Sequence, residues 1–172
     1  MNRRVITGFD ADGKATVVSD GPVPVVLTSD KVPGYAIGEA AFIDGIPAHF
    51  STIDTEGREW SLEPPPGGLV WRIVVRPPES GTNALEGLLD EVGAEVGRSD
   101  ADYAPGKGGM HTTATVDLLI ILSGEVWLTV GDDEEVHLKA GDFILQGGVP
   151  HAWHNRGTEP CVMAGVMMGA VP

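Results

Sequence analysis

Apolar residues occur along this chain in short runs that glycines and prolines separate. The 172 residues include 24 glycines and 13 prolines. Short apolar runs with regularly spaced turn residues between them are typical of β-sandwiches and barrels. The pattern therefore predicts an all-β protein.

The first third of the chain is predicted to form an accessory β-structure. The runs VITGF and ATVVS flank an Asp12-Gly13 pair, which suits a tight hairpin turn. The next run, PVPVVLTS, contains Pro22 and Pro24 and so favours an edge strand. The segment EPPPGG then interrupts any regular element. We expect residues 1–66 to form an N-terminal β extension that packs on the main domain or on a partner subunit.

One helix is predicted, over about residues 84–97. Five residues recur at i, i+3, i+4, i+7 and i+11 and form one apolar stripe: Leu85, Leu88, Leu89, Val92 and Val96. Asn83 and Glu86 have the spacing of a capping box, and Gly97 is a suitable C-terminal stop. The stripe is expected to lie on the barrel, and a lid over the barrel mouth is the alternative.

Four strand runs follow one another closely in the last third of the chain. They read TVDLLIIL, EVWLTV, EEVHLKA with DFILQ, and CVMAGVMM. The connections between them are only a few residues long, for example Ser123-Gly124 and Ala140-Gly141. Connections of this length join antiparallel neighbours, so an antiparallel arrangement is expected here.

Charge and cysteine content narrow the classes of partner. The formal net charge of −14 opposes binding to phosphate backbones and anionic lipid surfaces, so we expect no nucleic acid and no membrane partner. The single cysteine, Cys161, cannot form an intramolecular disulfide and is expected to be a buried, inert thiol. No apolar stretch is long enough for a signal peptide or a membrane span, so a cytoplasmic location is expected.

The chemistry is expected within residues 109–155. His111 precedes a predicted strand, Asp117 begins it, and His151 follows another strand after a glycine turn. Asp117 shares a strand face with Leu119 and Ile121 by period-2 alternation. A carboxylate on an apolar face is costly unless it is paired, hydrogen-bonded or bound to a cation. Two imidazoles and one carboxylate suit a divalent transition metal, so His111, Asp117 and His151 are the predicted metal ligands.

This region resembles the two-motif signature of the cupin superfamily. Its first motif has the pattern His-x-His, then a carboxylate, then a glycine that closes a turn. His111, Asp117 and Gly124 match it. The second motif ends in a histidine and, four residues later, an asparagine, which His151 and Asn155 match. The resemblance runs from Leu69 onward and implies a double-stranded β-helix, or jelly-roll, barrel over residues 67–172.

The sequence departs from the cupin motifs at positions that concern the metal. Thr113 replaces the second histidine, Asp117 replaces the usual glutamate with a shorter side chain, and Gln146 replaces a proline. Thr113, Gln146 and Trp153 are expected around the ligands, where a hydroxyl could orient a metal-bound water. A metal-free barrel is therefore an alternative, in which the same residues form a hydrogen-bonded cluster that binds a small molecule or performs acid–base chemistry.

The sequence of the motifs is also similar to that of small bacterial and fungal cupins, some of which are described as cupin-domain oxidoreductases of polyketide pathways. This resemblance implies a metal-dependent enzyme acting on a small organic molecule, as an oxidoreductase or as a Lewis-acid isomerase, dehydratase or decarboxylase. Fe, Mn, Ni, Zn and Cu all suit the ligand set. The alternative is a metal-free, non-catalytic small-molecule-binding cupin. Because a two-stranded hairpin is not stable alone, we also expect a homodimer.

Overall fold

The computed structural model describes residues 2–49, 58, 60–81, 83, 85, 87–88, 108–132 and 134–171. Eleven strands occur within these ranges. In chain order they are β1 Arg3–Phe9, β2 Ala15–Pro22, β3 Val25–Thr28, β4 Ala36–Ile43, β5 Leu69–Arg76, β6 Thr115–Ser123, β7 Glu125–Val130, β8 Glu134–Lys139, β9 Phe143–Gln146, β10 His151–His154 and β11 Cys161–Gly169. The strand runs predicted from the sequence correspond to β1–β3, β6–β9 and β11.

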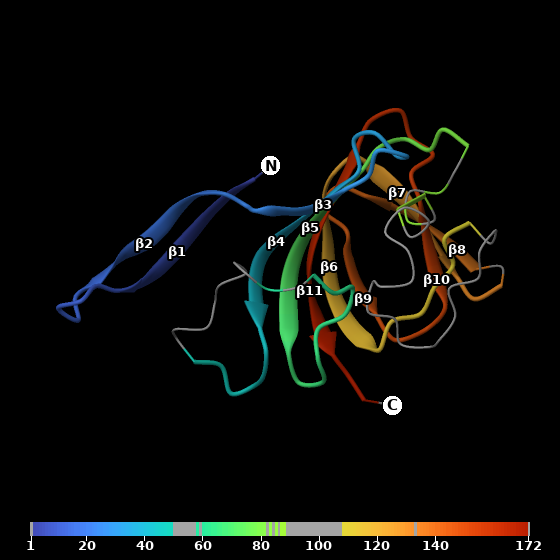
Figure 1. Cartoon of the computed structure of the whole chain (residues 1–172). Coiled ribbons are helices and arrows are strands. Elements are labelled where there is room, and N and C mark those ends of the chain that lie inside the picture. The colour runs from blue at the N-terminus through green and yellow to red at the C-terminus, as the bar shows by residue number, and fades with distance from the viewer. Residues whose placement is uncertain are drawn as a thin grey trace.

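Two sheets face each other and form a jelly-roll barrel (Figure 1). One has six strands in the order β3-β4-β5-β11-β6-β9, and the other has three in the order β10-β7-β8. The main apolar core contains Ile121 and Met163 from the first sheet and Val126, Leu128 and Trp153 from the second. Because both sheets contribute to one buried cluster, their inner faces enclose the core. The predicted all-β barrel is thus confirmed.

Three of the short connections do not join paired neighbours, contrary to expectation. β7 and β8 pair antiparallel as predicted, but β6 and β7 lie in different sheets, and so do β8 and β9 and also β9 and β10. Gly124 ends β6 with a φ of +73°, and the backbone of Pro160 and Cys161 passes close to it. The short connection is a corner between the sheets, and only the tertiary contacts of the corner distinguish it from a hairpin.

The N-terminal residues build two separate features. β3 and β4 extend the large sheet, since β4 pairs with β5. β1 and β2 form an antiparallel hairpin with Gly13 in its turn (φ +76°), as the sequence predicted. This hairpin projects away from the barrel (Figure 1), and we call it the arm.

The predicted helix is described only at its first turn. Leu85, Gly87 and Leu88 are helical, and the Gly87 N–H donates to the carbonyl of Asn83. The side chain of Asn83 accepts a hydrogen bond from the Leu85 N–H, which is the N-cap arrangement. Leu85 and Leu88 are buried against Tyr35 and Ile37, so this part of the stripe lies on the barrel. Residues 89–97 of the prediction lie outside the described residues.

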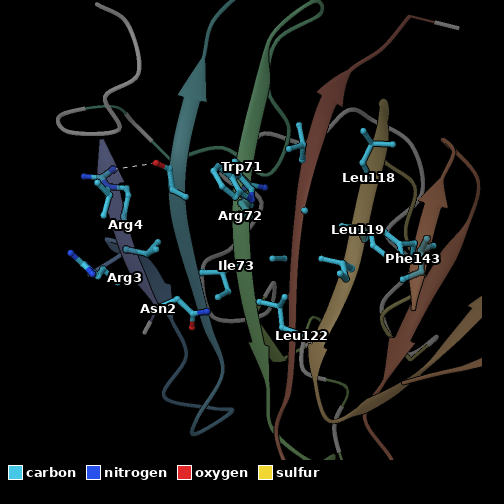
Figure 2. A pocket seen from close by; sticks show the side chains of 18 of the residues that line it. Asn2, Arg3, Arg4, Trp71, Arg72, Ile73, Leu118, Leu119, Leu122 and Phe143 are labelled. Carbon is cyan, nitrogen blue, oxygen red and sulfur yellow. Dashed lines mark hydrogen bonds between the residues drawn. The ribbon is translucent and has the colours of Figure 1, made fainter. Parts of the chain in front are cut away.

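The outer face of the large sheet carries an apolar groove of about 790 Å³ beside the arm (Figure 2). Trp71, Leu118 and Phe143 line it from three strands. Phe143 is 80% exposed, and Leu145, which also lines the groove, is 71% exposed. Apolar patches of this kind on a protein surface mark interaction sites.

Candidate functional site

His111 and His151 lie side by side in the barrel interior. They form an isolated antiparallel β-bridge, in which each backbone N–H donates to the other's carbonyl over 2.9 Å. The bridge adds the segment at His111 to the edge of the small sheet, next to β10. Their imidazole ring centroids are 4.3 Å apart, and both residues are buried. The two motif histidines thus come together as predicted.

Each of these imidazoles is oriented by a local backbone carbonyl. Nδ1 of His111 is 2.8 Å from the Gly109 oxygen, and Nδ1 of His151 is 2.9 Å from the Val149 oxygen. A carbonyl only accepts, so each Nδ1 carries the hydrogen and each neutral ring keeps a lone pair on Nε2. This assignment of the tautomers follows from the hydrogen bonds.

Burial keeps both imidazoles neutral. It is the main cause that lowers the pKa of His111 to about 3, and the neighbouring His151 and the charge of Arg76 lower it further. Burial and then Arg76 also lower the pKa of His151, against the opposing effect of the Val149 carbonyl. At neutral pH the pair therefore presents two bases and no charge.

Asp117 lies on the inner face of β6. It pairs across the strands with Gln146 of β9, and both side chains are buried. Its Oδ1 makes no hydrogen bond. Burial raises the pKa of this carboxyl to about 6, while Thr115 and Arg72 act to lower it. Its electrostatic neighbours are therefore Arg72 and Glu63.

The residues expected around the site are all buried. The Thr115 hydroxyl donates to the hydroxyl of Thr113 over 2.8 Å. The Gln146 side chain donates to the Gly147 carbonyl. Trp153 meets His151 edge-on, with ring centroids 6.0 Å apart, and also belongs to the apolar core. Trp153 thus lies beside His151 and also packs in the core.

The three predicted metal ligands do not assemble. The fold family implies a divalent metal, and the two Nε2 lone pairs would suit one. Within the described parts of the chain, however, no three His, Cys, Asp or Glu side chains gather closely enough to hold a metal ion. Aspartate is one methylene shorter than the glutamate usual in the motif, and Asp117 is not grouped with the histidines. The residues present therefore do not fit a three-ligand metal centre.

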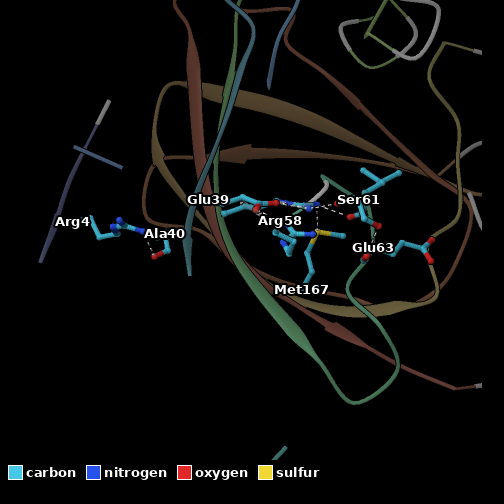
Figure 3. Close-up of polar contacts among 9 residues, drawn as sticks. Arg4, Glu39, Ala40, Arg58, Ser61, Glu63 and Met167 are labelled. Carbon is cyan, nitrogen blue, oxygen red and sulfur yellow. Dashed lines mark hydrogen bonds and ion pairs between the residues drawn. The ribbon is translucent and has the colours of Figure 1, made fainter. Parts of the chain in front are cut away.

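Two buried arginines, which the sequence analysis did not single out, also face the interior. Arg72 and Arg76 share the inner face of β5 with Val70 and Val74. Arg72 donates to Glu39 through Nε and Nη2, at 3.0 and 2.7 Å. Glu39 also accepts a hydrogen bond from Arg58 at 2.6 Å, and the carbonyls of Ser61 and Leu62 accept from Arg72 (Figure 3). The alternation of side chains along β5 could have revealed that both arginines share the face of the buried valines.

Asn155, the asparagine of the second motif, has a structural role. Its Nδ2 donates to the carbonyls of Arg76 and Glu159, at 2.8 and 2.9 Å, and its Oδ1 accepts from the Gly157 N–H. These bonds tie the start of β11 to the end of β5. The motif thus contains both interior and purely structural residues.

Comparisons with known proteins agree with the barrel. Residues 100–168 match the family model of the cupin domain. Oryzines biosynthesis cluster protein J from Aspergillus oryzae is 42% identical over 55 residues, which are 31% of each chain. Cupin-domain-containing oxidoreductase srdB from Neurospora crassa is 37% identical over 59 residues, 34% of this chain and 30% of that protein. The matches thus span about a third of these relatives' length.

Among solved structures, the cupin domain of Schizosaccharomyces pombe Cnp3 superposes with a TM-score of 0.47 at 10% identity. It covers 98% of this chain and 88% of that one. In the described part of the chain, no helix is long and apolar enough to cross a membrane.

Proposed function

We propose that this chain is an enzyme that binds a small organic molecule inside the barrel and uses the His111–His151 pair as its reactive group. The observation that carries the proposal is the pair itself, two buried imidazoles 4.3 Å apart whose Nδ1 atoms are both engaged by carbonyls. A neutral Nε2 accepts a proton from a substrate and returns it at another atom, which is the chemistry of isomerases and lyases. The names of the relatives are consistent with a small organic substrate.

A metal-dependent oxidoreductase is the second candidate. The two Nε2 lone pairs favour it, because second-sphere carbonyls commonly orient metal-bound histidines in this way. It requires a third ligand in addition to the pair, and Asp117 would have to approach to supply it. We therefore keep His111, Asp117 and His151 as the ligand set of this candidate only.

Thermal unfolding with added ligands tests the first proposal. The protein, treated with chelator, is titrated with neutral β-dicarbonyl and phenolic compounds, because binding to the native state raises the apparent stability. We expect a rise in melting temperature that His151→Gln abolishes and His137→Gln keeps, since His137 is half-exposed on β8 and stacks on Trp127. A rise of equal size in His151→Gln would contradict the proposal, and recovery of every bound compound unchanged would indicate a binding protein instead.

Metal analysis of the purified protein separates the two candidates. Substoichiometric metal that is unchanged in Asp117→Ala supports the metal-free enzyme and rules out the metal-dependent one. One equivalent of metal that is lost in Asp117→Ala and in His151→Gln, while both variants remain folded by circular dichroism, supports the metal-dependent oxidoreductase.

We further propose that the chain is a homodimer in which the arm of each subunit lies on the outer sheet face of the other. Nine large apolar side chains of these two surfaces are exposed: Val5, Phe9, Val17 and Val18 on the arm, and Trp71, Leu118, Leu122, Phe143 and Leu145 on the sheet. At roughly 200 Å² per large side chain, they expose on the order of 1,000 Å². A standard interface needs about 800 Å² per partner.

The symmetry of the arrangement supports this occupant over others. In a dimer with two-fold symmetry both subunits contribute the same surfaces. The arm and the sheet face of each subunit are therefore all buried in one interface. At about 3.3 Å per residue, a seven-residue strand such as β1 is about 23 Å long, close to the width of a six-stranded sheet.

We also predict a cytoplasmic location, because the single Cys161 provides no intramolecular disulfide.

A further inference from the structure

Arg76 ends β5 on the wall of the barrel interior. It is 6% exposed and lies opposite Cys161 of β11, which is completely buried. The alternation of β5 places it on the same inner face as Arg72, four residues earlier. The arginine therefore extends into the protein and not into solvent.

The guanidinium of Arg76 lacks the partners that a buried cation needs. Its Nε and Nη1 make no hydrogen bond, and it forms no ion pair with any residue that the structure describes. The ring centroid of Tyr35 lies 5.6 Å from the guanidinium carbon of Arg76. Arg72, by contrast, is equally buried but has the Glu39 carboxylate and two carbonyls as acceptors. A buried charge without a counterion is strongly destabilising.

Among the residues that the structure describes, none provides an anionic partner for Arg76. Arg76 is close enough to His111 and His151 for its charge to lower the pKa of both, and these rings are neutral. The interior carboxyl, Asp117, interacts instead with Arg72 on another part of the wall. Arg76 and the histidine pair thus provide unpaired donors, two Nε2 acceptors and one net positive charge.

We propose that Arg76 binds the carboxylate of the molecule held at the His111–His151 pair, so that the ligand of this barrel is a small organic acid. The inference rests on the proposed function, to which it adds the class of substrate. One arginine neutralises one carboxylate, and the planar guanidinium matches carboxylate geometry. A phosphate dianion would need a second cation. The apolar side chains of Trp153 and Met163 in the adjoining core suit the organic part of such an acid.

The test compares charged and neutral ligands of the same shape. The full-length protein is titrated with benzoate, pyruvate, the uncharged isostere benzamide and inorganic phosphate, with melting temperature and calorimetry as readouts. We expect at least one of the two carboxylates to bind, and benzamide and phosphate to bind far more weakly. Arg76→Gln should weaken carboxylate binding about 10- to 150-fold, which is the usual effect of losing a hydrogen bond to a charged group. Arg156→Gln, which changes a half-exposed arginine paired with Glu135, should leave it unchanged.

The stability of the ligand-free variants provides a second readout. Because Arg76→Gln removes an uncompensated charge, it should unfold at the same denaturant concentration as the wild type or at a higher one. Arg76→Lys, which keeps the charge without the planar fork, should retain part of the carboxylate binding.

Three outcomes would overturn the inference: neither carboxylate binds better than benzamide, Arg76→Gln binds the carboxylate as tightly as the wild type, or ligand-free Arg76→Gln is strongly destabilised. If one of these outcomes is found, binding of the neutral β-dicarbonyl or phenolic compounds that depends on His151 would still leave the proposed function standing.

Discussion

Arg72 and Arg76 lie four residues apart on the same inner face of β5 and have opposite surroundings. Arg72 is held by Glu39, which is 1% exposed, and by the backbone of residues 61 and 62. Arg76 has no acidic partner in the described part of the chain. One arginine therefore stabilises the barrel wall only as half of an ion pair, and the other is available to a ligand.

Replacing Glu39 should reveal how much the ion pair matters. Glu39→Gln leaves Arg72 buried without a counterion, which typically costs about 3 to 5 kcal/mol of unfolding free energy. Urea denaturation followed by circular dichroism measures it. Glu135→Gln breaks the exposed pair with Arg156 and should cost about 0 to 1 kcal/mol. Equal effects of the two substitutions would show that burial does not govern these pairs.

The thiol of Cys161 is expected to be unreactive in the native protein. Burial is the main cause that raises its pKa from 9.0 to about 11. Between these two pH values the thiol stays protonated in the native state, whereas in the unfolded chain it deprotonates. Near pH 9 we expect no alkylation of the native thiol and complete alkylation in denaturant, measured by mass spectrometry. Stability should also fall as the pH rises from about 9 towards 11, because the unfolded state deprotonates first. Native labelling at the denatured rate would contradict this prediction.

At the scale of elements, the corner at Gly124 decides how β6 and β7 are arranged. Its positive φ of +73° is unfavourable for any residue with a Cβ, and an added Cβ would lie 2.6 Å from the Pro160 carbonyl oxygen. The neighbouring atoms are backbone, which cannot rotate away. The corner therefore requires glycine both for its conformation and for its close contact.

Alanine substitutions at two turns should separate these two requirements. Gly131 has a similar positive φ of +59° with nothing near the position of a Cβ, so Gly131→Ala should cost about 1 to 2 kcal/mol for the left-handed conformation alone. Gly124→Ala should cost clearly more, because the clash with the Pro160 backbone is added. Chemical denaturation of both variants measures the difference, and equal costs would mean that the corner can relax.

Most of the strands, though not β4 and β10, could be predicted from the sequence, and their pairing could be predicted only in part. Period-2 alternation from Thr115 to Ile121 follows directly from which side chains must be buried, and the structure confirms it. Whether Gly124 makes a hairpin or a corner depends on contacts with Pro160, 36 positions further along the chain. In the same way, the bridge of His111 and His151 follows the motif, whereas the position of Asp117 relative to them depends on how the two sheets pack.

At the scale of the whole molecule, the arm and the apolar sheet face predict the assembly state. Sedimentation velocity at micromolar concentration should give twice the chain mass. Phe143→Glu should give the monomer, because a charge would be buried in the proposed interface, and its unfolding transition should stay intact since the side chain is 80% exposed. Val171→Glu, which changes an exposed residue near the C-terminus, is the matched control and should remain dimeric. A monomeric wild type would contradict the proposed dimer.

The sequence by itself determined the class of fold, the positions of most strands and the two motif histidines. These follow from short-range rules, namely the alternation of side chains along a strand, the turn residues and the spacing of the motifs. The tertiary structure alone decided which interior charges are satisfied. Arg72 and Arg76 have the same place in the alternation, and only the fold brings Glu39 to one and the histidine pair to the other. Within the described residues it also leaves His111, Asp117 and His151 without the grouping that a metal ion needs, because distances across a barrel depend on how two sheets pack and not on any local pattern.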